Sequence, residues 1–208
     1  MIPSEIAQAI KQAGLKSLTP EALARFDTYL ALLQKWNARL SLTAIRDTRT
    51  IVYRHLVESI QCAEALPEPS SGSNLLDFGS GAGLPGIPIA ICRPEIYVTM
   101  AESQGKKASF LREAVRTLNL KAEVFAGRVE AMPSEQKFHL VTLRAVDKMA
   151  TASSVAAERL STRGWIVLFT TKGTEAGIKA ALPRIDWKKQ IPLSGLSHGS
   201  LLFGRRGE

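Results

Sequence analysis

The N-terminal third of the chain has the hydrophobic spacing of amphipathic helices. Between residues 4 and 66, apolar side chains recur three and four positions apart. The clearest run comprises Ala22, Leu23, Phe26, Leu30 and Leu33. Thr19 and Pro20 form a helix start, because a threonine hydroxyl can cap a backbone N–H and proline is tolerated in the first turn. We therefore expect a helical section that ends at the breaker-rich segment 67–73.

Beyond this segment, short apolar runs alternate with helical patterns. Strands are expected at residues 75–78, 96–101, 122–126, 140–144 and 165–170, and helices at 85–92, 106–119 and 149–160. Because parallel strands need crossover connections, this alternation predicts an α/β fold with a parallel sheet and helices on both faces. Two last strands, at 187–192 and 201–205, predict an antiparallel hairpin at the sheet end. Residues 1–72 would form an N-terminal helical cap on a domain spanning 73–208, together one compact unit.

Composition favours a globular protein that acts in the cytoplasm. The 208 residues are 45% hydrophobic, and the apolar runs are strand-sized. A membrane span needs roughly 20 apolar residues, and the first residues lack a signal-peptide pattern, so no membrane association is expected. Cys62 and Cys92 lie in apolar helical patterns without metal-ligand spacing, which predicts buried thiols and no metal site.

The charge distribution suggests a polyanionic partner. The formal net charge is +8 and the isoelectric point about 9.7. Residues 1–72 carry eight basic and seven acidic side chains, so +7 of the net charge belongs to residues 73–208. Lysine and arginine that neutralise phosphates gain affinity by releasing counterions, although many basic proteins bind no nucleic acid.

The segment from Asp77 to Gly86, DFGSGAGLPG, is the most informative in the chain. It leaves a predicted strand, crosses a glycine-rich turn and enters a helix whose first turn can accept Pro85. Alternating glycines let the backbone approach a ligand closely, and a helix start offers N–H groups to an anion. A nucleoside cofactor with an anionic group fits this segment.

Two cofactor types compete for this loop. Gly81, Gly83 and Gly86 form a G-x-G-x-x-G pattern, which is typical of dinucleotide binding. The first glycine of that fingerprint should close the strand, and here Gly79 does so, which puts the pattern out of register. Asp77 followed by Gly-x-Gly-x-Gly looks like the first motif of class I S-adenosylmethionine (SAM) dependent methyltransferases. A dinucleotide site and a structural turn that binds nothing remain the alternatives.

A carboxylate follows the second predicted strand. Glu102 stands about as far after Gly79 as the ribose-binding acid of such folds does, and it can accept hydrogen bonds from both ribose hydroxyls. A surface glutamate is the alternative.

Some methyl acceptors require particular catalytic residues, and this sequence lacks several of them at the expected positions. Carbon-5 methylation of a pyrimidine needs a cysteine nucleophile, and both cysteines are expected to be buried. Exocyclic-amine methylation often uses an Asn/Asp-Pro-Pro-Tyr/Phe loop after the fourth strand, where this chain reads LRAVD at 143–147. His55, His139 and His198 have no triad-like company and are predicted to be structural or surface residues. A ring nitrogen such as guanine N7 needs no general base and therefore suits this chain.

A set of short motifs spread from Trp36 to Gly173 is specific to one family. They are Trp36-Asn37, Ser41-Leu42-Thr43 with Arg46-Asp47, Arg54-His55-Leu56 with Ser59, Asp77 to Pro88, Ser103 with Lys106-Lys107, Phe110-Leu111, Arg128-Val129-Glu130, Arg144-Ala145 and Lys172-Gly173. In these motifs the chain resembles the RsmG (GidB) family of bacterial ribosomal RNA methyltransferases. The resemblance implies a Rossmann-like class I fold with a mostly parallel seven-stranded sheet. It also implies SAM-dependent methylation of N7 of a guanosine in the 530 loop of 16S ribosomal RNA.

The resemblance also implies a set of site residues. The expected cofactor-binding residues are Asp77, Gly79, Gly81, Leu84, Glu102, Ser103, Val129, Glu130 and Arg144. Arg144 would position the substrate, because arginine stays protonated and cannot serve as a base; a salt bridge to a carboxylate is its alternative. The chain departs from the usual family pattern at two of these places: Glu102 stands where aspartate is common, and Gly127 precedes Arg128.

The expected partner is 16S ribosomal RNA or a precursor of the small subunit, with no DNA, and the enzyme is expected to be a monomer. Two groups of basic residues would flank the pocket and hold the RNA backbone, and a solvated surface is the alternative for each. The N-terminal group includes Arg46, Arg49 and Arg54, the group on the helix after Glu102 includes Lys106 and Lys107, and Lys172 is a further candidate. The rival hypotheses are a methyltransferase for a small molecule or a protein, and a non-catalytic SAM- or RNA-binding module.

Overall fold

The computed structural model describes residues 2–43, 47–70, 72–194 and 199–208. The helical elements are α1 (Ile2–Gln12), α2 (Pro20–Asn37), α3 (Thr48–Thr50), η1 (Ile51–Leu56), α4 (Val57–Ala65), α5 (Gly86–Cys92), α6 (Gly105–Thr117), η2 (Val129–Ala131), α7 (Met149–Glu158) and α8 (Glu175–Ala181). The strands are β1 (Asn74–Phe78), β2 (Tyr97–Ala101), β3 (Ala122–Phe125), β4 (Phe138–Leu143), β5 (Leu160–Thr171), β6 (Ile185–Pro192) and β7 (Gly199–Arg206). The predicted alternation of strands and helices is confirmed.

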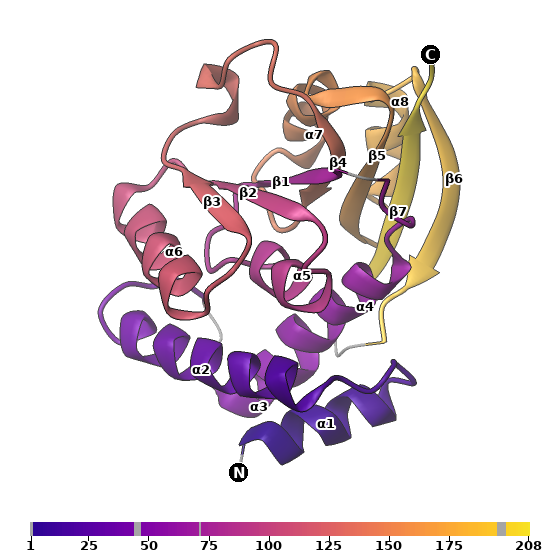
Figure 1. The fold of residues 1–208 in the computed structure, drawn as a ribbon. Coiled ribbons are helices and arrows are strands. Elements are labelled where there is room, and N and C mark those ends of the chain that lie inside the picture. The colour runs from indigo at the N-terminus through magenta and orange to yellow at the C-terminus, as the bar shows by residue number, and fades with distance from the viewer. Residues whose placement is uncertain (1, 44–46, 71, 195–198) are drawn as a thin grey trace.

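One seven-stranded sheet organises the molecule, with the order β3-β2-β1-β4-β5-β7-β6. Strands β1 to β5 are parallel, and β7 runs antiparallel to both of its neighbours, β5 and β6. The β6–β7 hairpin lies at one end of the sheet, as Figure 1 shows. The mostly parallel sheet with an antiparallel C-terminal hairpin is therefore confirmed.

Helices cover both faces of this sheet, and two hydrophobic clusters fill the two interfaces. Neighbouring residues of a strand belong to different clusters, as Leu75 and Leu76 of β1 do, because successive side chains point to opposite faces. In Figure 1, α4, α5 and α6 lie on one side of the sheet, and α7 and α8 lie on the other.

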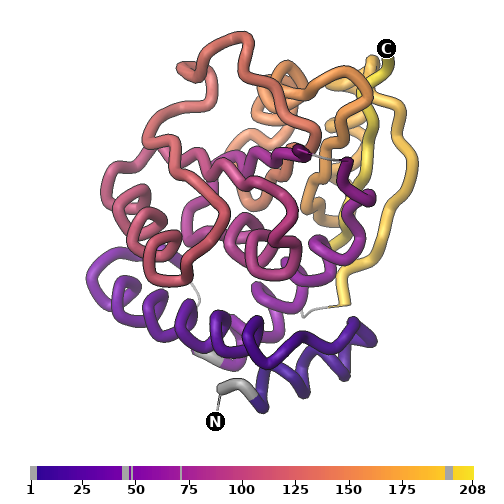
Figure 2. Tube along the Cα trace, viewed as in Figure 1, coloured from indigo at the N-terminus to yellow at the C-terminus, as the bar shows by residue number. Residues whose placement is uncertain are grey.

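The N-terminal helices share the first of these clusters. Ile6 of α1 and Phe26 of α2 are fully buried in the same cluster as Ile87 of α5 and Phe110 of α6. Figure 2 shows the N-terminal part of the tube, in indigo, running along α5 and α6. Residues 1–72 are thus packed as part of the main core, on the side of the sheet that carries α4 to α6.

Two local differences from the expected elements have plain causes. Helix α8 was not predicted, because it has seven residues and buries only Ile178, which gives no periodic pattern. Strand β5 begins at Leu160, ahead of the expected 165, because residues 161–164 read STRG and carry no strand-like apolar alternation. The predicted start of α2 is confirmed, with the Thr19 side chain accepting a hydrogen bond from the Ala22 N–H at 3.2 Å.

The two cysteines are free thiols. Cys62 is fully buried, whereas Cys92 keeps some exposure. Burial raises the pKa of both thiols, that of Cys92 to about 12. Both thiols are therefore protonated at neutral pH. No helix in the described part of the chain is long and apolar enough to span a bilayer.

Candidate active site

Two adjoining cavities lie where β1, β2 and β4 end. We call the larger one, of about 510 Å³, the Arg144 cavity, and the smaller one, of about 320 Å³, the Glu130 cavity. The Arg144 cavity is lined by Leu42, Thr43, Arg54, His55, Gly79, Ser80, Gly81, Ala82, Leu84, Glu102, Gln104, Lys107, Arg144, Ala145, Val146 and Asp147. The Glu130 cavity is lined by Phe78, Gly79, Ala101, Ser103, Gly127, Arg128, Val129, Glu130, Val146, Asp147, Lys148, Thr151, Ala152 and Val155. They share Gly79, Val146 and Asp147, so a ligand at Gly79 reaches both.

The loop after β1 needs its glycines. Gly79, Gly81 and Gly83 have φ angles of +69°, +54° and +83°, in the left-handed region that side chains other than glycine rarely adopt. A Cβ on Gly79 would stand 3.4 Å from a methyl of Val146, and one on Gly83 would stand 2.3 Å from Cδ1 of Ile87. The loop is therefore packed closely on one side and opens onto both cavities at Gly79.

Asp77 holds this loop from beneath. Its side chain is buried and accepts two hydrogen bonds, from the Thr142 hydroxyl at 2.9 Å and from the Gly86 N–H at 3.1 Å. Burial raises the pKa of this carboxyl group to about 6, against the lowering effect of its hydrogen bonds. Asp77 lines neither cavity, so its place in the structure supports a role in loop geometry and gives no support to direct cofactor contact.

The loop amides are largely satisfied within the protein. The N–H groups of Gly83 and Leu84 both donate to the carbonyl of Ser80, at 2.7 and 3.2 Å. The Gly86 N–H is taken by Asp77. The expectation that the helix start offers free N–H groups to an anion is therefore wrong at these three positions. An anionic group of the cofactor has to find other donors in the Arg144 cavity.

Glu102 is bound to the backbone on both oxygens. Oε2 accepts from the Gly81 N–H at 2.9 Å, and Oε1 accepts from the Gln104 N–H at 2.8 Å. The residue is 6% exposed and lines the Arg144 cavity. Each carboxylate oxygen has a second lone pair, so a ribose contact remains a prediction compatible with this geometry.

The guanidinium of Arg144 is enclosed by the N-terminal helices. Nη2 forms a salt bridge with Glu58 at 2.5 Å, and Nη1 donates to the Ser59 hydroxyl at 3.0 Å. The carbonyls of Arg54 and His55 accept further N–H groups at 3.2 and 3.3 Å. The salt bridge that the sequence left as an alternative is thus present, and the guanidinium is not free to seek a distant phosphate.

A π-helical stretch makes this enclosure possible. Element η1 lies between α3 and α4, and its wider turn pairs the Val57 N–H with the Val52 carbonyl five residues earlier. Such stretches are frequent at functional sites, because the altered ladder leaves carbonyl groups for other donors. Here two carbonyls of η1 receive Arg144.

His55 belongs to this site, although the sequence predicted only a structural or surface residue. Its Nδ1 lies 3.0 Å from Nη2 of Arg144, and its Nε2 lies 3.3 Å from the Thr43 hydroxyl. Burial, with help from Arg144 and Arg54, lowers the pKa of His55 to about 4. The imidazole is therefore neutral near pH 7, and since Nδ1 faces a guanidinium donor, we assign the proton to Nε2. The spacing of three and four residues that separates Glu58 and Ser59 from His55 was visible in the sequence, but the pairing of these residues with Arg144 was not.

Arg159 stabilises the segment that carries Val129 and Glu130 in the wall of the Glu130 cavity. Its Nη1 donates to the Pro133 carbonyl at 2.6 Å, and its Nη2 donates to the carbonyls of Met132 and Glu130 at 3.1 and 3.4 Å. These contacts fix the short helix η2, on which Val129 and Glu130 line the cavity. No sequence pattern pointed to Arg159, because its partners are carbonyl groups and carry no side-chain signature.

Strained backbone borders the same cavities. Ala145 and Lys148, in the loop between β4 and α7, both have a φ angle of +51°. Residues other than glycine hold such angles only where their surroundings impose them, and these outliers gather at functional sites. Ala145 lines the Arg144 cavity and Lys148 lines the Glu130 cavity.

The basic residues predicted to contact RNA fall in different places. Arg54 and Lys107 line the Arg144 cavity, and Lys106 lines a separate pocket between α2 and α6. Arg49 lies over the Tyr53 ring at 5.7 Å and Lys172 is exposed in the turn after β5, both outside the lining of these cavities. Arg46 lies outside the described residues. Among the residues that the structure describes, no group of three or more His, Cys, Asp or Glu could hold a metal ion.

The sheet order, the glycine turn after β1 and the cavities at the carboxyl ends of the strands define a class I SAM-dependent methyltransferase fold. Solved structures share it. A predicted O-methyltransferase from Agrobacterium tumefaciens aligns with a TM-score of 0.60 and 19% identity, over 73% of this chain and 81% of that chain. A 16S rRNA N2 methyltransferase of T. thermophilus, solved with AdoMet and guanosine, aligns with a TM-score of 0.57 and 20% identity, over 79% of this chain and 44% of that one.

Sequence comparison gives the particular family. The family model described as "rRNA small subunit methyltransferase G", GidB, matches residues 22–197. A ribosomal RNA small subunit methyltransferase G from Stenotrophomonas maltophilia is 42% identical over 200 residues, covering 93% of this chain and 90% of the relative. One from Methylobacillus flagellatus is 46% identical over 147 residues, covering 70% and 69%. The chain belongs to the rRNA small subunit methyltransferase G family.

Proposed function

We propose that this protein transfers the methyl group of SAM to N7 of a guanosine in the 530 loop of 16S ribosomal RNA. The observation that carries the proposal is the family match over residues 22–197, which takes in both cavities. The substrate named for the relatives is thereby extended to this chain.

The two cavities are the right size and in the right place for the cofactor and the target base. Cavities of about 300–1,000 Å³ are usual for small-molecule sites, and the pair at Gly79 falls in this range. The adenine would lie in the Glu130 cavity beside Val129 and Glu130, and the methionine part would cross Gly79 into the Arg144 cavity. When bound there, SAM supplies an electrophilic methyl group.

The Arg144 cavity suits a methyl acceptor atom that carries no proton and therefore needs no general base. Guanine N7 attacks with a free lone pair, so the protein needs to orient the base without removing a proton. His55 lines the cavity, but its Nδ1 already faces Arg144, which leaves it poorly placed as a general base. This arrangement favours a ring nitrogen over an oxygen or an exocyclic amine.

Arg144 would border the methyl-transfer pocket as a fixed donor. Its two terminal nitrogens are used by Glu58, Ser59 and η1. No partner for its Nε–H is found among the residues that the structure describes, so this donor is the one left for a ligand. A guanine O6 or the methionine carboxylate would be within the chemistry of such a donor.

The proposal is tested by incubating purified protein with SAM and small-subunit RNA from cells that lack the enzyme. Nucleosides are then identified by mass spectrometry, with naked 16S RNA and 30S particles as parallel substrates. We expect 7-methylguanosine in the 530 loop. Methylation at another atom, methylation of a protein or small molecule only, or SAM binding without transfer would each refute the proposed function.

We further propose a monomeric enzyme that works in the cytoplasm, where bacterial ribosomal RNA is assembled into subunits. DNA is not expected as a substrate. Light scattering on the purified protein, cell fractionation and a DNA duplex control in the methylation assay check these three points.

A further inference from the structure

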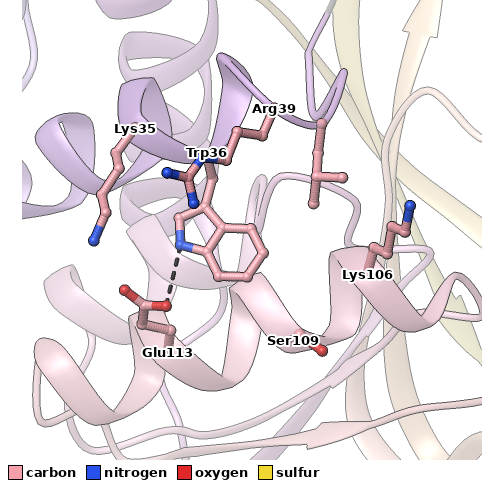
Figure 3. Close-up of a pocket in the computed structure, with 7 residues that line it drawn as sticks. Lys35, Trp36, Arg39, Lys106, Ser109 and Glu113 are labelled. Carbon is pink, nitrogen blue, oxygen red and sulfur yellow. Dashed lines mark hydrogen bonds between the residues drawn. The ribbon is translucent and has the colours of Figure 1, made fainter.

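A third pocket, distinct from the two cavities, lies between the end of α2 and the start of α6. It has a volume of about 350 Å³ and is lined by Lys35, Trp36, Arg39, Leu40, Lys106, Ser109 and Glu113. Figure 3 shows the Trp36 indole at its centre, with Arg39 above it and Lys35 and Lys106 to either side. We call it the Trp36 pocket.

The indole of Trp36 is fixed in place. Its Nε1–H donates to Oε2 of Glu113 at 3.1 Å, as the dashed line in Figure 3 marks. The Phe110 ring packs edge-on against it, with 5.9 Å between ring centroids and 64° between the planes. Trp36 is nevertheless only partly buried, so it offers a rigid aromatic surface that costs little entropy to use.

The pocket carries uncompensated positive charge. Lys35, Arg39 and Lys106 have no side-chain ion pair or hydrogen bond with any residue in the described ranges. The single carboxylate of the lining, Glu113, is engaged with the indole. An aromatic platform among lysine and arginine side chains is the combination that binds unpaired nucleotides, by base stacking and phosphate contacts.

The Trp36 pocket adjoins the Arg144 cavity along two chain segments. Lys106 lines the pocket and its neighbour Lys107 lines the cavity. In the same way, Leu40 lines the pocket and Leu42 lines the cavity. An RNA strand whose target guanosine enters the Arg144 cavity therefore has a path over the α6 start to Trp36.

We propose that the Trp36 pocket binds an unpaired nucleotide of the substrate RNA close to the methylated guanosine, with the base on Trp36 and the backbone phosphate between Arg39 and Lys106. The inference rests on the proposed function, since it assumes an RNA substrate. The net positive charge of the lining, from Lys35, Arg39 and Lys106 against the single carboxylate of Glu113, favours RNA over a protein segment as the occupant.

The first test compares two double variants with the same change in charge. Arg39→Gln/Lys106→Gln alters the pocket, and Lys11→Gln/Lys179→Gln alters exposed lysines on α1 and α8. Binding to naked 16S RNA is measured over a range of salt concentrations. We expect the pocket variant to bind at least about tenfold more weakly and its log–log salt slope to fall by about 0.7, the value for one single-strand phosphate contact. Equal behaviour of the two variants would overturn the proposal.

The second test concerns the indole. With Trp165 and Trp187 replaced by phenylalanine, Trp36 is the one tryptophan of the chain, and a stacked base should quench its fluorescence on RNA addition. In the natural background, Trp36→Phe should retain most RNA affinity, whereas Trp36→Leu should lose about fivefold or more. An unchanged emission, or equal binding by the two Trp36 variants, contradicts stacking. The KM for SAM, which should not change, reports on folding.

Measurements on naked RNA and on 30S particles distinguish failure of the proposed function from failure of the Trp36 pocket inference. If the unaltered protein forms no 7-methylguanosine, the proposed function fails. If it does so while the pocket variants match the controls on naked RNA, only the Trp36 pocket inference fails. A defect confined to 30S particles would identify a ribosomal protein as the occupant and would equally overturn the inference.

Discussion

At the scale of the residue, the main feature of this site is the buried ion pair between Arg144 and Glu58. Arg144 and Glu58 have side chains 10% and 2% exposed, so their ion pair lies in a region where water screens little. Removing one partner of a buried pair leaves the other charge uncompensated, whereas an exposed pair contributes little. The pair therefore fixes Arg144 against η1 and α4, and its loss should be felt both in stability and in catalysis.

Replacing Glu58 tests this directly. Glu58→Gln should lower the free energy of unfolding by about 3 kcal/mol or more, because the Arg144 guanidinium then stays buried without a counter-charge. Urea denaturation gives the difference. The control is Glu68→Gln, which removes the exposed partner of Arg93 (N–O 3.8 Å) and should leave the midpoint unchanged. Comparable losses in the two variants would show that Arg144 is not stabilised by the pair.

Asp77 predicts a pH effect of definite sign. Its folded-state pKa, raised to about 6 from 3.8, means that the folded protein binds more protons than the unfolded chain between these values. The stabilisation is complete below pH 4 and is lost as the pH rises through 6. Asp77→Asn removes it, so the stability of the natural protein relative to this variant should fall by up to ~3 kcal/mol over that range.

The measurement is a set of urea titrations from pH 4 to pH 8 on both proteins. His55, whose lowered pKa acts in the opposite direction, is present in both and cancels in the difference. A difference that rises with pH would show that Asp77 is stabilised as a carboxylate and would contradict the assigned direction.

At the scale of the element, the glycine loop and η1 do different work. The loop turns β1 into α5 with three left-handed glycines, and at Gly83 close packing against Ile87 also excludes a side chain. Element η1 widens one turn of the helix between α3 and α4 and presents its carbonyls to Arg144. The loop lines the Arg144 cavity, and η1 orients the side chain of Arg144.

A pair of alanine substitutions separates strain from packing in the loop. Both Gly81→Ala and Gly83→Ala force alanine into a positive φ, a cost of about 1–2 kcal/mol. At Gly81 the new Cβ meets only the Gly79 carbonyl at 3.8 Å, whereas at Gly83 it stands 2.3 Å from Ile87, which is fully buried and cannot turn away. Thermal unfolding without cofactor should show the larger loss for Gly83→Ala, and equal losses would argue against the clash.

Helix η2 depends on Arg159. Arg159→Lys keeps the charge but loses the planar fork that reaches three carbonyls, so the Glu130 cavity should loosen. We expect a stability loss of about 1.5–3 kcal/mol and a raised KM for SAM with little change in kcat at saturation. Arg163→Lys, at an exposed arginine paired with Glu208, is the control. A changed kcat at unchanged KM would contradict a role confined to cofactor binding.

At the scale of the whole molecule, the N-terminal helices and the sheet form one packed body. Tyr29 of α2 is fully buried and its hydroxyl donates to the Ala82 carbonyl of the glycine loop at 2.6 Å. Gln61 of α4 bonds Pro192 of β6 and the Ser194 N–H beyond it, at 2.9 and 2.8 Å. The cofactor loop and the hairpin are thus tied to the helices that precede them.

Removing residues 1–72 should therefore abolish folding. The truncated chain would expose the apolar face of α5 and α6 that Phe26, Leu30 and Leu33 now cover. Circular dichroism and SAM binding should show an unfolded or aggregated fragment, and the full chain should unfold in one transition. A folded fragment 73–208 that binds SAM would instead show that the cap is a separate domain.

The sequence alone determined the sheet, the hairpin and the position of the cofactor loop. Strand-helix alternation is a local property of the hydrophobic pattern, and the glycines of the loop are required by backbone angles at those residues themselves. The same holds for the start of α2 at Thr19, since a helix cap involves residues only three positions apart.

Only the tertiary structure decided which groups surround the site. Arg144 contacts Glu58, 86 positions away in the sequence, and Trp36 contacts Glu113, 77 positions away. Helix and strand periodicity relates only residues a few positions apart, so it cannot predict these contacts. Asp77 and Glu102 show the same limit, because the sequence marked both as polar groups near the cofactor but not that their oxygens are taken by backbone amides and a threonine. Those partners depend on how strands and helices pack, and packing is a property of the whole fold.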